Sequence, residues 1–516
     1  MGALTLLAAC GGGGGGDGAA TIPPPTVTGA LSYVPGQFLA SSTFANRCAA
    51  PRSGTDPITH QTYPDKTGTA TDENNFLRSW TDELYLWYSE VPDLNPASYA
   101  TPDYFNLLKT SATTASGSPK DKFHFTYATS TWESLSQSGV TLGYGVRFQV
   151  LHSTVPRNVV VAFVEATASG AAATLARGAT VQAIDGVDID TTDQGGISTL
   201  NAGLTPSTNG EMHTFTIQDL NATMTRQVML TAAPVTEDPV PVVNTLPGNV
   251  GYILFTDHIA PSEQELVTAF AGFKQRGVTD LVLDIRYNGG GYLDIASEVA
   301  YMIAGSAQTA GRTFELTQFN DKYPSTDPVT GEPITPMPFH STTQGLSTTS
   351  GQALPALNLM RVFVLTGPGT CSASESIINS LRGINVQVIQ VGSTTCGKPY
   401  GFYPQDNCGT TYFSIQFRGV NNQGFGDYPD GFSPANTVQT EGVSIPGCSV
   451  ADDFSHALGD PNEALLNVAL SYASTSSCSV PPSGSSAPTG IKRMLRPSPE
   501  LSARPAFLEN RILRRP

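Results

Sequence analysis

Hydrophobic residues in the region 70–112 recur at intervals close to 3.6, the period of an α-helix. The apolar side of this pattern consists of Phe76, Leu77, Trp80, Leu84, Trp87 and Tyr88. Pro92 and Pro96 end the first helix, and a second short helix is predicted over 101–110. The simplest interpretation of the aromatic residues is a face that packs against a core.

From about residue 136 the pattern changes to short β-segments. Residues 159–164 are rich in β-branched side chains and predict a strand, and 170–175 predict a short helix of small residues. Asp185-Gly186 is a tight-turn signal between two further strands. This part of the chain is therefore expected to be a small β-rich domain.

From residue 247 apolar strand segments alternate with amphipathic helices, which predicts an α/β domain with a parallel sheet. The predicted strands are 250–255, 280–286, 360–365 and 386–391, and the predicted helices are 262–276, 293–304, 372–382 and 460–472. Ser262 and Asp460 are expected to cap two of these helices, because a glutamate follows each of them three residues later. Residues 308–352 are rich in Thr, Pro, Ser and Gly and predict a long loop or flap.

Length and charge narrow the class of protein. The 516 residues are too many for one ordinary core, so two to four domains are expected. The net charge of -16 argues against nucleic acid as a partner. The sequence contains no run of 18 apolar residues, so no membrane-spanning helix is predicted. Residues 479–516 differ, with seven Lys/Arg against two Asp/Glu. They predict a flexible, solvated basic arm, with contact to anionic lipid or another surface as the alternative.

The N-terminus combines a short apolar run with Cys10 and six glycines. Leu7-Ala8-Ala9-Cys10 resembles the lipobox of a bacterial lipoprotein signal, although a positive n-region is missing. The resemblance implies lipidation of Cys10 and a membrane-anchored, periplasm-facing protein of the cell envelope, with Gly11 compatible with the outer membrane. A meaningless apolar N-terminus is the alternative. Residues 11–45 are expected to be a tether that does not fold alone.

The other cysteines are even in number, which favours disulfides in an exported chain. Two pairs are expected because each brackets one local segment, and the third remains by elimination. The expected pairs are Cys396 with Cys408, Cys448 with Cys478, and Cys48 with Cys371. No spacing resembles a zinc site, and no metal or cofactor is expected.

Three segments of the α/β region carry candidate chemistry. Ser372 offers a hydroxyl in Gly-Pro-Gly-Thr-Cys-Ser-Ala-Ser-Glu, Lys398 offers an amine 26 residues later, and the glycine loop in 283–291 offers backbone N–H groups. A nucleophile, a base that takes its proton, and N–H groups that stabilise an oxyanion are what acyl transfer requires. The set predicts an acyl-transfer hydrolase.

Two side chains compete for the role of base. His258 follows a core strand, but its neighbour Asp257 points to the opposite face of that strand, which favours a structural histidine. Lys398 lies in a segment, 391–405, with no other charge; burial disfavours the ammonium form and leaves an amine able to accept a proton. The alternatives are an ordinary surface lysine and a Ser372 that only caps a helix.

Residues 247–476 resemble the C-terminal processing (tail-specific) peptidases, the S41 family of serine proteases. Three motifs carry the resemblance: Asp284-Ile-Arg286-Tyr-Asn288-Gly-Gly290-Gly291, Ser372-Ala-Ser-Glu375 and Thr395-Cys-Gly-Lys398. The family's core implies a ClpP/crotonase-like α/β fold. A crotonase-type acyl-CoA enzyme is a rival at the level of the fold alone.

The resemblance also implies roles for individual residues. Ser372 would be the nucleophile and Lys398 the general base, with an oxyanion hole formed by the N–H groups of Ala373 and Gly290. Glu375 and Arg286 would support the site electrostatically. The chain departs from the family pattern in a Ser-to-Lys spacing one residue longer than usual and in Phe402, which stands where glutamine is often found. Another group, such as a backbone carbonyl, is therefore expected to orient the lysine.

The β-rich region resembles a PDZ domain. Its run from Gly178 to Gly186 matches the family's "Gly-Asp-x-Ile-x-x-Ile-Asp-Gly" except at Ala179 and Val181. The peptide-binding loop implied by the resemblance is Gly143, Tyr144, Gly145 and Val146, which would bind a peptide's C-terminal carboxylate while the peptide adds as a strand. The alternative is that these glycines only make a tight turn.

The expected fold class is an α/β (ClpP/crotonase-like) peptidase core with an inserted PDZ β-barrel-like domain and a small helical N-terminal domain. The expected division is 1–10 signal, 11–45 tether, 46–135 helical domain, 136–240 PDZ domain, 245–478 peptidase core and 479–516 basic disordered tail. The expected function is that of an exported serine endopeptidase, with a Ser372–Lys398 dyad and polypeptide partners recognised through their C-termini. The alternative is an inactive adaptor that keeps the fold and binds peptides.

Overall fold

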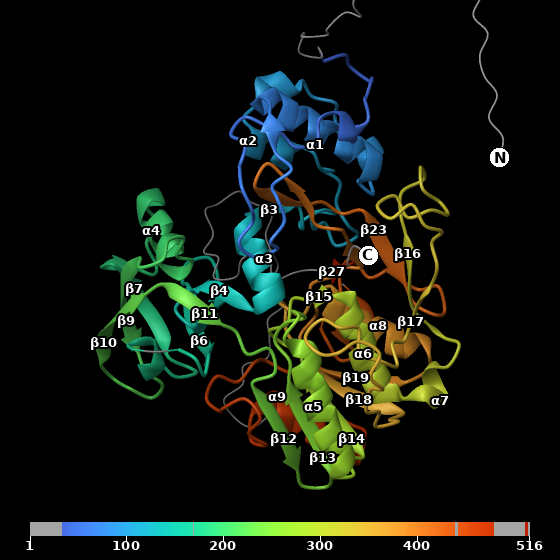
Figure 1. Ribbon diagram of the computed structural model, residues 1–516. Helices are drawn as coiled ribbons and strands as arrows, with labels where there is room; N and C mark the ends of the chain where they lie inside the picture. The colour runs from blue at the N-terminus through green and yellow to red at the C-terminus, as the bar shows by residue number, and fades with distance from the viewer. Residues whose placement is uncertain (1–32, 169, 439–441, 479–510, 514–516) are drawn as a thin grey trace, which may run out of the picture.

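The computed structural model describes residues 33–168, 170–438, 442–478 and 511–513 (Figure 1). A helical part lies at the top of the view, a β-rich part at the left, and an α/β part at the bottom and right. Cys10 and most of the predicted 11–45 tether and 479–516 arm lie outside the described residues. No described helix is both long and apolar enough to cross a membrane.

The α/β part is built on a six-stranded sheet in the order β12-β13-β14-β18-β19-β26. Strands β13 to β26 are parallel, and β12 pairs antiparallel with β13 at the edge. The strands are β12 (Val242–Leu246), β13 (Val250–Leu254), β14 (Asp280–Asp284), β18 (Arg361–Thr366), β19 (Gln387–Gly392) and β26 (Gly447–Ser449). The apolar side chains of β13, β14, β18 and β19 are buried, as expected of parallel strands covered on both faces.

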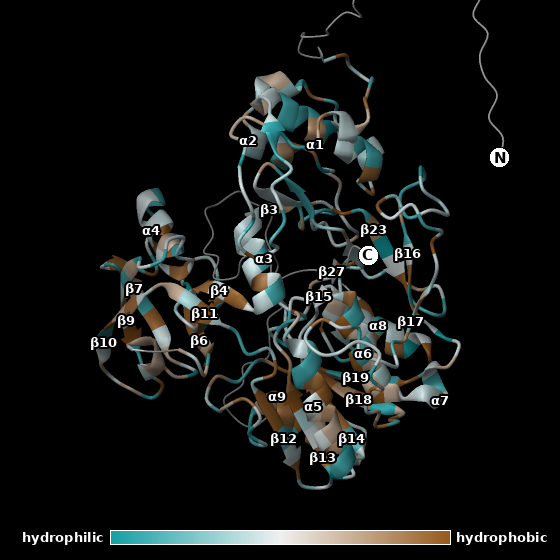
Figure 2. Cartoon of the chain, in the orientation of Figure 1, coloured by the Kyte–Doolittle hydropathy of each residue, from teal (hydrophilic) through white to brown (hydrophobic). Residues whose placement is uncertain are grey.

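Helices cover both faces of this sheet, so the predicted alternation of strands and helices is confirmed. Three helices pack on one face and a fourth packs on the other. They are α5 (Ser262–Gln275), α6 (Leu293–Ala304) and α8 (Ala373–Gly383) on the first face, and α9 (Ala464–Thr475) on the second. Figure 2 shows hydrophobic residues concentrated where α9 meets the sheet.

The β-rich part has a sheet and an apolar core of its own. The strand order is β10-β9-β7-β6-β5, with β8 paired to β7, and a separate ladder joins β4 to β11. The elements are β4 (Val140–Gly143), β5 (Val146–His152), β6 (Asn158–Val164), β7 (Thr180–Ile184), β8 (Val187–Asp188), α4 (Gln194–Leu204), β9 (Met212–Gln218), β10 (Thr225–Thr231) and β11 (Ala233–Thr236). A PDZ identity for this part stays a prediction.

The N-terminal part confirms the predicted helices. They are α1 (Ala70–Leu84) and α2 (Thr101–Leu107), and a third helix, α3 (Thr129–Ser138), was not predicted. The apolar stripe of α1 is buried against α2, and Thr69 caps α1 with Asp72. This part is joined to the α/β part by strand β3 (Phe125–Ala128), which pairs with β22 (Thr410–Phe413).

Two predicted helix caps are wrong. Pro261 precedes α5 without a capping bond, and the hydroxyl of Ser262 instead donates to the carbonyl of Ile259. Helix α9 begins at Ala464, and Glu463 caps it through the N–H of Leu466. A different residue therefore caps α9, whereas no side chain caps α5.

The disulfides are Cys48–Cys408, Cys371–Cys396 and Cys448–Cys478. The predicted Cys448–Cys478 pair is confirmed, and the other two predicted pairs are wrong. Proximity along the chain misleads here, because Cys48 and Cys408 are 360 residues apart in sequence. The fold brings them together beside β22.

The predicted flap at 308–352 is more regular than expected. It contains the strands β16 (Thr313–Gln318) and β17 (Met337–Pro338), and β16 pairs with β23 (Phe417–Val420). The carboxylate of Glu263 on α5 accepts N–H groups from five successive residues of this region, Gln344, Gly345, Leu346, Ser347 and Thr348. The segment is therefore fastened to the core along much of its length.

The predicted disordered arm is also wrong at its end. Arg511–Ile512 forms strand β27, which pairs in parallel with β15 (Gly291–Tyr292). The side chain of Ile512 is 2% exposed. The basic composition of 479–516 predicts a solvated arm, but an overall composition cannot indicate that one isoleucine, Ile512, is buried.

Candidate active site

Ser372 lies in the turn between β18 and α8, directly before the first helical residue, Ala373. Its backbone has φ 61° and ψ −114°, a conformation that costs a non-glycine residue on the order of 1–3 kcal/mol. The preceding residues hold the turn: Cys371 N donates to Asn288 O at 3.1 Å, and the Thr370 hydroxyl donates to Ile285 O at 2.8 Å. The serine is thus presented from a fixed turn.

The carboxylate of Glu375 joins this turn to the Lys398 segment. Its Oε2 accepts the N–H of Ser372 at 3.0 Å and the N–H of Lys398 at 2.8 Å. Its Oε1 accepts the N–H of Gly397 at 2.9 Å and the hydroxyl of Thr395 at 2.5 Å. Burial raises the pKa of Glu375, and the four donors oppose that shift without cancelling it.

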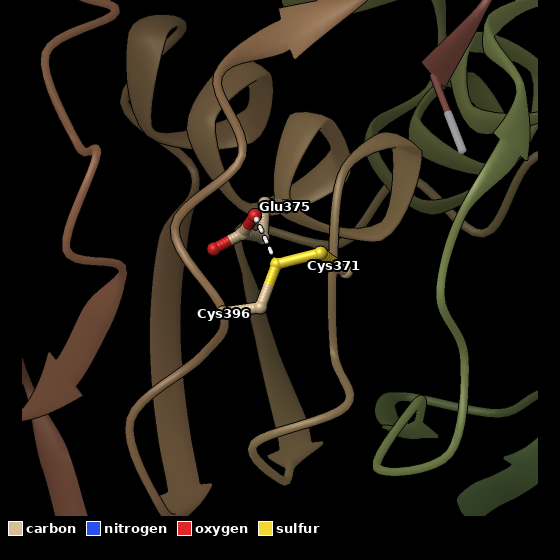
Figure 3. Close-up of side chains that lie close together, drawn as sticks. All are labelled: Cys371, Glu375 and Cys396. Atoms are coloured by element: carbon tan, nitrogen blue, oxygen red, sulfur yellow. Dashed lines mark hydrogen bonds between the residues drawn. A yellow bond between two sulfur atoms is a disulfide. The ribbon is translucent and has the colours of Figure 1, made fainter. Parts of the chain in front are cut away.

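The Cys371–Cys396 disulfide links the same two segments covalently (Figure 3). The dashed line in Figure 3 joins Cys396 Sγ and Glu375 Oε2, which are 3.6 Å apart. A disulfide sulfur carries no hydrogen, so this is a contact rather than a hydrogen bond. The three side chains also lie close enough together to suggest a metal site, but they do not suit one. The sulfurs are not thiolates, and both carboxylate oxygens already accept hydrogen bonds.

The side chain of Lys398 is fully buried between aromatic rings. Its Nζ lies 4.6 Å from the ring centre of Phe123 and 4.7 Å from that of Phe402. Phe402 is the residue that replaces the family's glutamine, and its ring is a wall of the amine pocket. Phe123 comes from the N-terminal part, which therefore completes the surroundings of Lys398.

Ser372 Oγ is buried and has no hydrogen-bond partner among the described residues. A direct Oγ–Nζ hydrogen bond between Ser372 and Lys398 is therefore not formed in this state. Catalytic hydrogen bonds commonly tighten only when substrate is bound. The dyad stays a prediction.

Asn288 organises the glycine loop. Its Oδ1 accepts the N–H of Gly290 at 2.9 Å and lies 2.9 Å from His258 Nδ1, while its Nδ2 donates to Phe255 O at 3.1 Å. These three contacts fix the amide orientation and make Nδ1 of His258 the protonated nitrogen. The predicted oxyanion donor Gly290 N–H is thus committed to Asn288 in this state. Ala373 N–H, at the start of α8, keeps the favourable position of a helix N-terminus.

His258 is a structural histidine here rather than the base. Burial lowers its pKa to about 3, so the ring is neutral over the physiological range. Its Nε2 has no hydrogen-bond partner among the described residues, so neither ring nitrogen bonds to Ser372. The structure offers no contact for a Ser-His mechanism.

Arg286 lies behind the loop in a buried charge network. Its Nε donates to Asp284 at 3.0 Å, its Nη1 and Nη2 donate to Glu463 at 2.7 and 3.0 Å, and Nη1 also donates to Asp452 at 2.7 Å. Burial alone would lower the pKa of Arg286, but the three carboxylates outweigh it and raise the pKa. The arginine is thus a charged support for the strand that leads into the glycine loop.

Residues 249–402 match the family model of peptidase family S41. The chain carries a peptidase S41 domain. The protein is therefore a serine-type peptidase with an S41 domain.

One solved structure extends the likeness of the fold beyond the S41 domain. An S41-assigned protease from Bacteroides fragilis NCTC 9343 is 22% identical with a TM-score of 0.57, over 80% of this chain and 98% of that one. A photosystem II D1 C-terminal processing protease is 19% identical with a TM-score of 0.41, over 74% of this chain and 94% of that one. No curated protein sequence matches the chain.

Outside the S41 domain, the predicted peptide-binding loop is anchored to its own β-rich core. Tyr144 is buried, and its hydroxyl donates to Gly203 O at the end of α4 at 3.0 Å. Gly145 has φ +71°, and a Cβ there would lie 2.8 Å from Ala168 Cβ, so glycine is required. Strand β5, which begins at Val146, lies at the end of the strand order, and no described strand pairs with its outer edge.

Three features of the site escape the sequence analysis. The Asn288–His258 contact, the Phe123 wall and the strand Arg511–Ile512 each join segments that are far apart in the chain. Asn288 stands within the quoted glycine-loop motif, so its presence was a usable signal. The other two carry no local pattern.

Proposed function

We propose that this serine-type peptidase is an exported endopeptidase that works through a Ser372–Lys398 dyad. Neutral Lys398 Nζ accepts the proton of the Ser372 hydroxyl as Oγ bonds to the carbonyl carbon of a peptide. The peptide C–N bond then breaks and the departing amine takes the proton. Water hydrolyses the acyl-enzyme and restores the serine.

The single observation that carries this proposal is the bridging carboxylate of Glu375. The N atoms of Ser372 and Lys398 share one acceptor, Oε2, so they lie within 5.8 Å of each other, the sum of the two hydrogen-bond lengths. A carboxylate and a disulfide both hold the predicted nucleophile next to the predicted base. A serine that only caps a helix would need neither.

The transition state needs donors for the developing oxyanion. Ala373 N–H is one, and Gly290 N–H becomes the second once Asn288 Oδ1 releases it on substrate binding. Each such donor contributes on the order of 3 kcal/mol of transition-state stabilisation. The hydrogen bond between Gly290 N–H and Asn288 in the substrate-free state is part of the proposal. It means that the oxyanion hole is complete only when substrate is bound.

The β-rich part would supply recognition, as the PDZ resemblance implies. Its edge strand β5 and the loop from Gly143 to Val146 are arranged for a peptide that adds as a strand, with its C-terminal carboxylate at the loop. Lipidation at Cys10 would anchor the protein to a membrane of the cell envelope, facing the periplasm.

Casein hydrolysis tests the dyad. Ser372→Ala and Lys398→Ala are each expected to reduce the rate by about 10³-fold or more, and the exposed controls Ser474→Ala and Lys274→Ala to leave it unchanged. An amine base further predicts a rate that rises into the mildly alkaline range. Equal hydrolysis by all variants would refute the dyad. No hydrolysis by the wild type, with retained peptide binding, would instead favour the adaptor.

A further inference from the structure

Residues Arg511–Leu513 lie in a slot between the two segments that carry the predicted chemistry. On one side, β27 pairs with Gly291–Tyr292, which directly follows Gly290. On the other side, Ile512 bridges to Phe402, four residues after Lys398, and Leu513 N donates to Phe402 O at 3.4 Å. Figure 1 shows β27 beside β15, at the centre of the molecule. The segment is thus a strand added between two active-site edges.

The side chain of Ile512 fills an apolar pocket in this slot. It is 2% exposed and packs in one cluster with Ile259, Cys371, Phe402 and Phe413. Cys371 is the residue before the predicted nucleophile. The pocket therefore lies where a substrate side chain would need to go, and it accepts a branched aliphatic one.

The glycine edge is shaped for an extended chain. Gly291 has φ +141°, and a Cβ there would lie 2.3 Å from His258 O. Tyr292 N donates to His258 O at 2.9 Å, so the inner edge of this segment is already satisfied. Only the outer edge of β15 is left for an added strand, and β27 pairs with that edge. Adding a strand to an open edge is the common way in which proteins hold extended peptides.

A cavity of about 270 Å³ adjoins Leu513. Its lining includes Tyr403 and the carboxylates of Glu315, Asp327 and Glu332. The sequence that follows Leu513 is Arg514-Arg515, opposite in charge to that lining. The slot and the cavity together suit a peptide in which one or two apolar residues precede basic ones.

We propose that Arg511–Leu513 occupies the substrate groove of the S41 domain as an internal competitor. The proposal rests on the proposed peptidase function, because it takes this slot to be where substrates bind. Substrates with an apolar residue followed by basic residues displace the segment. Because the competitor belongs to the same chain, its effective concentration does not depend on the concentration of the enzyme.

Kinetics on the full chain test the competition. Ile512→Asp removes the apolar anchor and is expected to raise kcat/KM for a short apolar-basic peptide about tenfold, mainly through KM. Val438→Asp is the matched control, because Val438 is 86% exposed, and it should leave kcat/KM unchanged. Ile512→Gly serves as a second variant should the aspartate perturb folding. An unchanged or lower kcat/KM in both folded variants overturns the proposal.

A binding experiment separates this proposal from the dyad. A fluorescent peptide of residues 506–516 is titrated against Ser372→Ala and against Ser372→Ala/Ile512→Asp, neither of which is expected to consume it. Roughly tenfold tighter binding to the double variant supports internal competition even if no protein hydrolyses casein. Equal binding by both overturns it even if the dyad is correct. The same peptide with Arg514 and Arg515 replaced by glutamate should bind more weakly; equal binding of that peptide overturns the proposed basic preference.

Discussion

Two strand edges in this molecule are proposed to hold an extended peptide, and they differ in the structure that supports them. The edge at β15 lies in the S41 domain between His258 and β27, with the Arg286 charge network and the Cys371–Cys396 disulfide behind it. The edge at β5 belongs to the small β-rich part, and no described strand pairs with its outer side.

The difference indicates that the two edges suit different roles, positioning of reacting atoms at β15 and recognition at β5. The β15 edge is held by buried charges, a covalent link and hydrogen bonds, which suits a site that must position reacting atoms. The ladder between β5 and β6 contains two register shifts, between Arg147 and Phe148 and between Val150 and His152. Such bulges bend an exposed strand and limit uncontrolled pairing. A more flexible recognition site is therefore expected at β5, and a more rigid site is expected at β15.

The largest expected effect is the loss of the charge network behind β15. Arg286→Ala would leave Asp284 and Glu463 buried without their partner and lower the free energy of unfolding by about 3–5 kcal/mol. Arg361→Ala breaks the half-exposed pair with Asp280 and should cost at most about 1 kcal/mol. Urea unfolding followed by circular dichroism measures both. Similar losses would show that the network is not a special support.

Removing the disulfide beside the site is expected to affect both stability and turnover. Cys371→Ala/Cys396→Ala should lower the free energy of unfolding by about 3 kcal/mol and reduce kcat about tenfold, since Ser372 and Lys398 lose their covalent link. The Cys448–Cys478 disulfide closes a loop of similar length, 30 residues against 25, so Cys448→Ala/Cys478→Ala should cost similar stability with little change in kcat. An equal fall in kcat would contradict a positioning role for Cys371–Cys396.

The two regions should also respond to acid with opposite signs. Burial lowers the pKa of His258 from 6.5 to about 3, so the unfolded chain binds a proton that the folded chain does not. The contribution of His258 to the free energy of unfolding is complete above pH 6.5 and is lost as the pH falls, by about 3 kcal/mol at pH 4. His258→Asn, which keeps an N–H donor near Asn288, should flatten this decline in unfolding experiments between pH 7 and pH 4.

His213, in the β-rich part, provides the contrast. Burial would lower its pKa, but hydrogen bonds to Glu211 and Asp185 outweigh burial and raise it. Its contribution is therefore complete below pH 6.5 and is lost as the pH rises through the raised pKa. His213→Asn should cost more stability at pH 5 than at pH 9. The same pH trend for both histidine variants would contradict this assignment.

The smallest expected effect lies at the β5 edge. Tyr144→Phe removes the hydroxyl that donates to Gly203 O and should cost about 1 kcal/mol. If this loop binds substrate C-termini, KM for casein should rise by at most about fivefold, while KM for a short peptide stays constant. A rise for both substrates would place the effect in the S41 domain instead.

The sequence was sufficient where the structure depends on local pattern. The helix over Leu293–Ala304, the buried strands and the position of Ser372 before α8 follow from periodicity and turn residues. Glu375 was expected to support the site, but its bond to the Lys398 N–H was not predictable, because that bond depends on how two loops meet.

Long-range pairings were the main failure. Cys48–Cys408 and β15–β27 join segments hundreds of residues apart, and neither composition nor spacing contains that information. Ser262 and Asp460 show a milder case: Glu463 caps α9 in place of Asp460, and no side chain caps α5. Gly290 is a further case, since its N–H is present as expected but donates to Asn288 Oδ1.

The Cys48–Cys408 disulfide has a consequence for how the protein is made and how it is cut. If the chain is exported from its N-terminus, as proposed, residue 408 must cross the membrane before Cys48 can form its disulfide, and the N-terminal wall of the lysine pocket is then fixed late. Once it is sealed, one protease cut anywhere between these cysteines leaves the two fragments joined. On a gel without reductant such a nicked molecule would still run as one species.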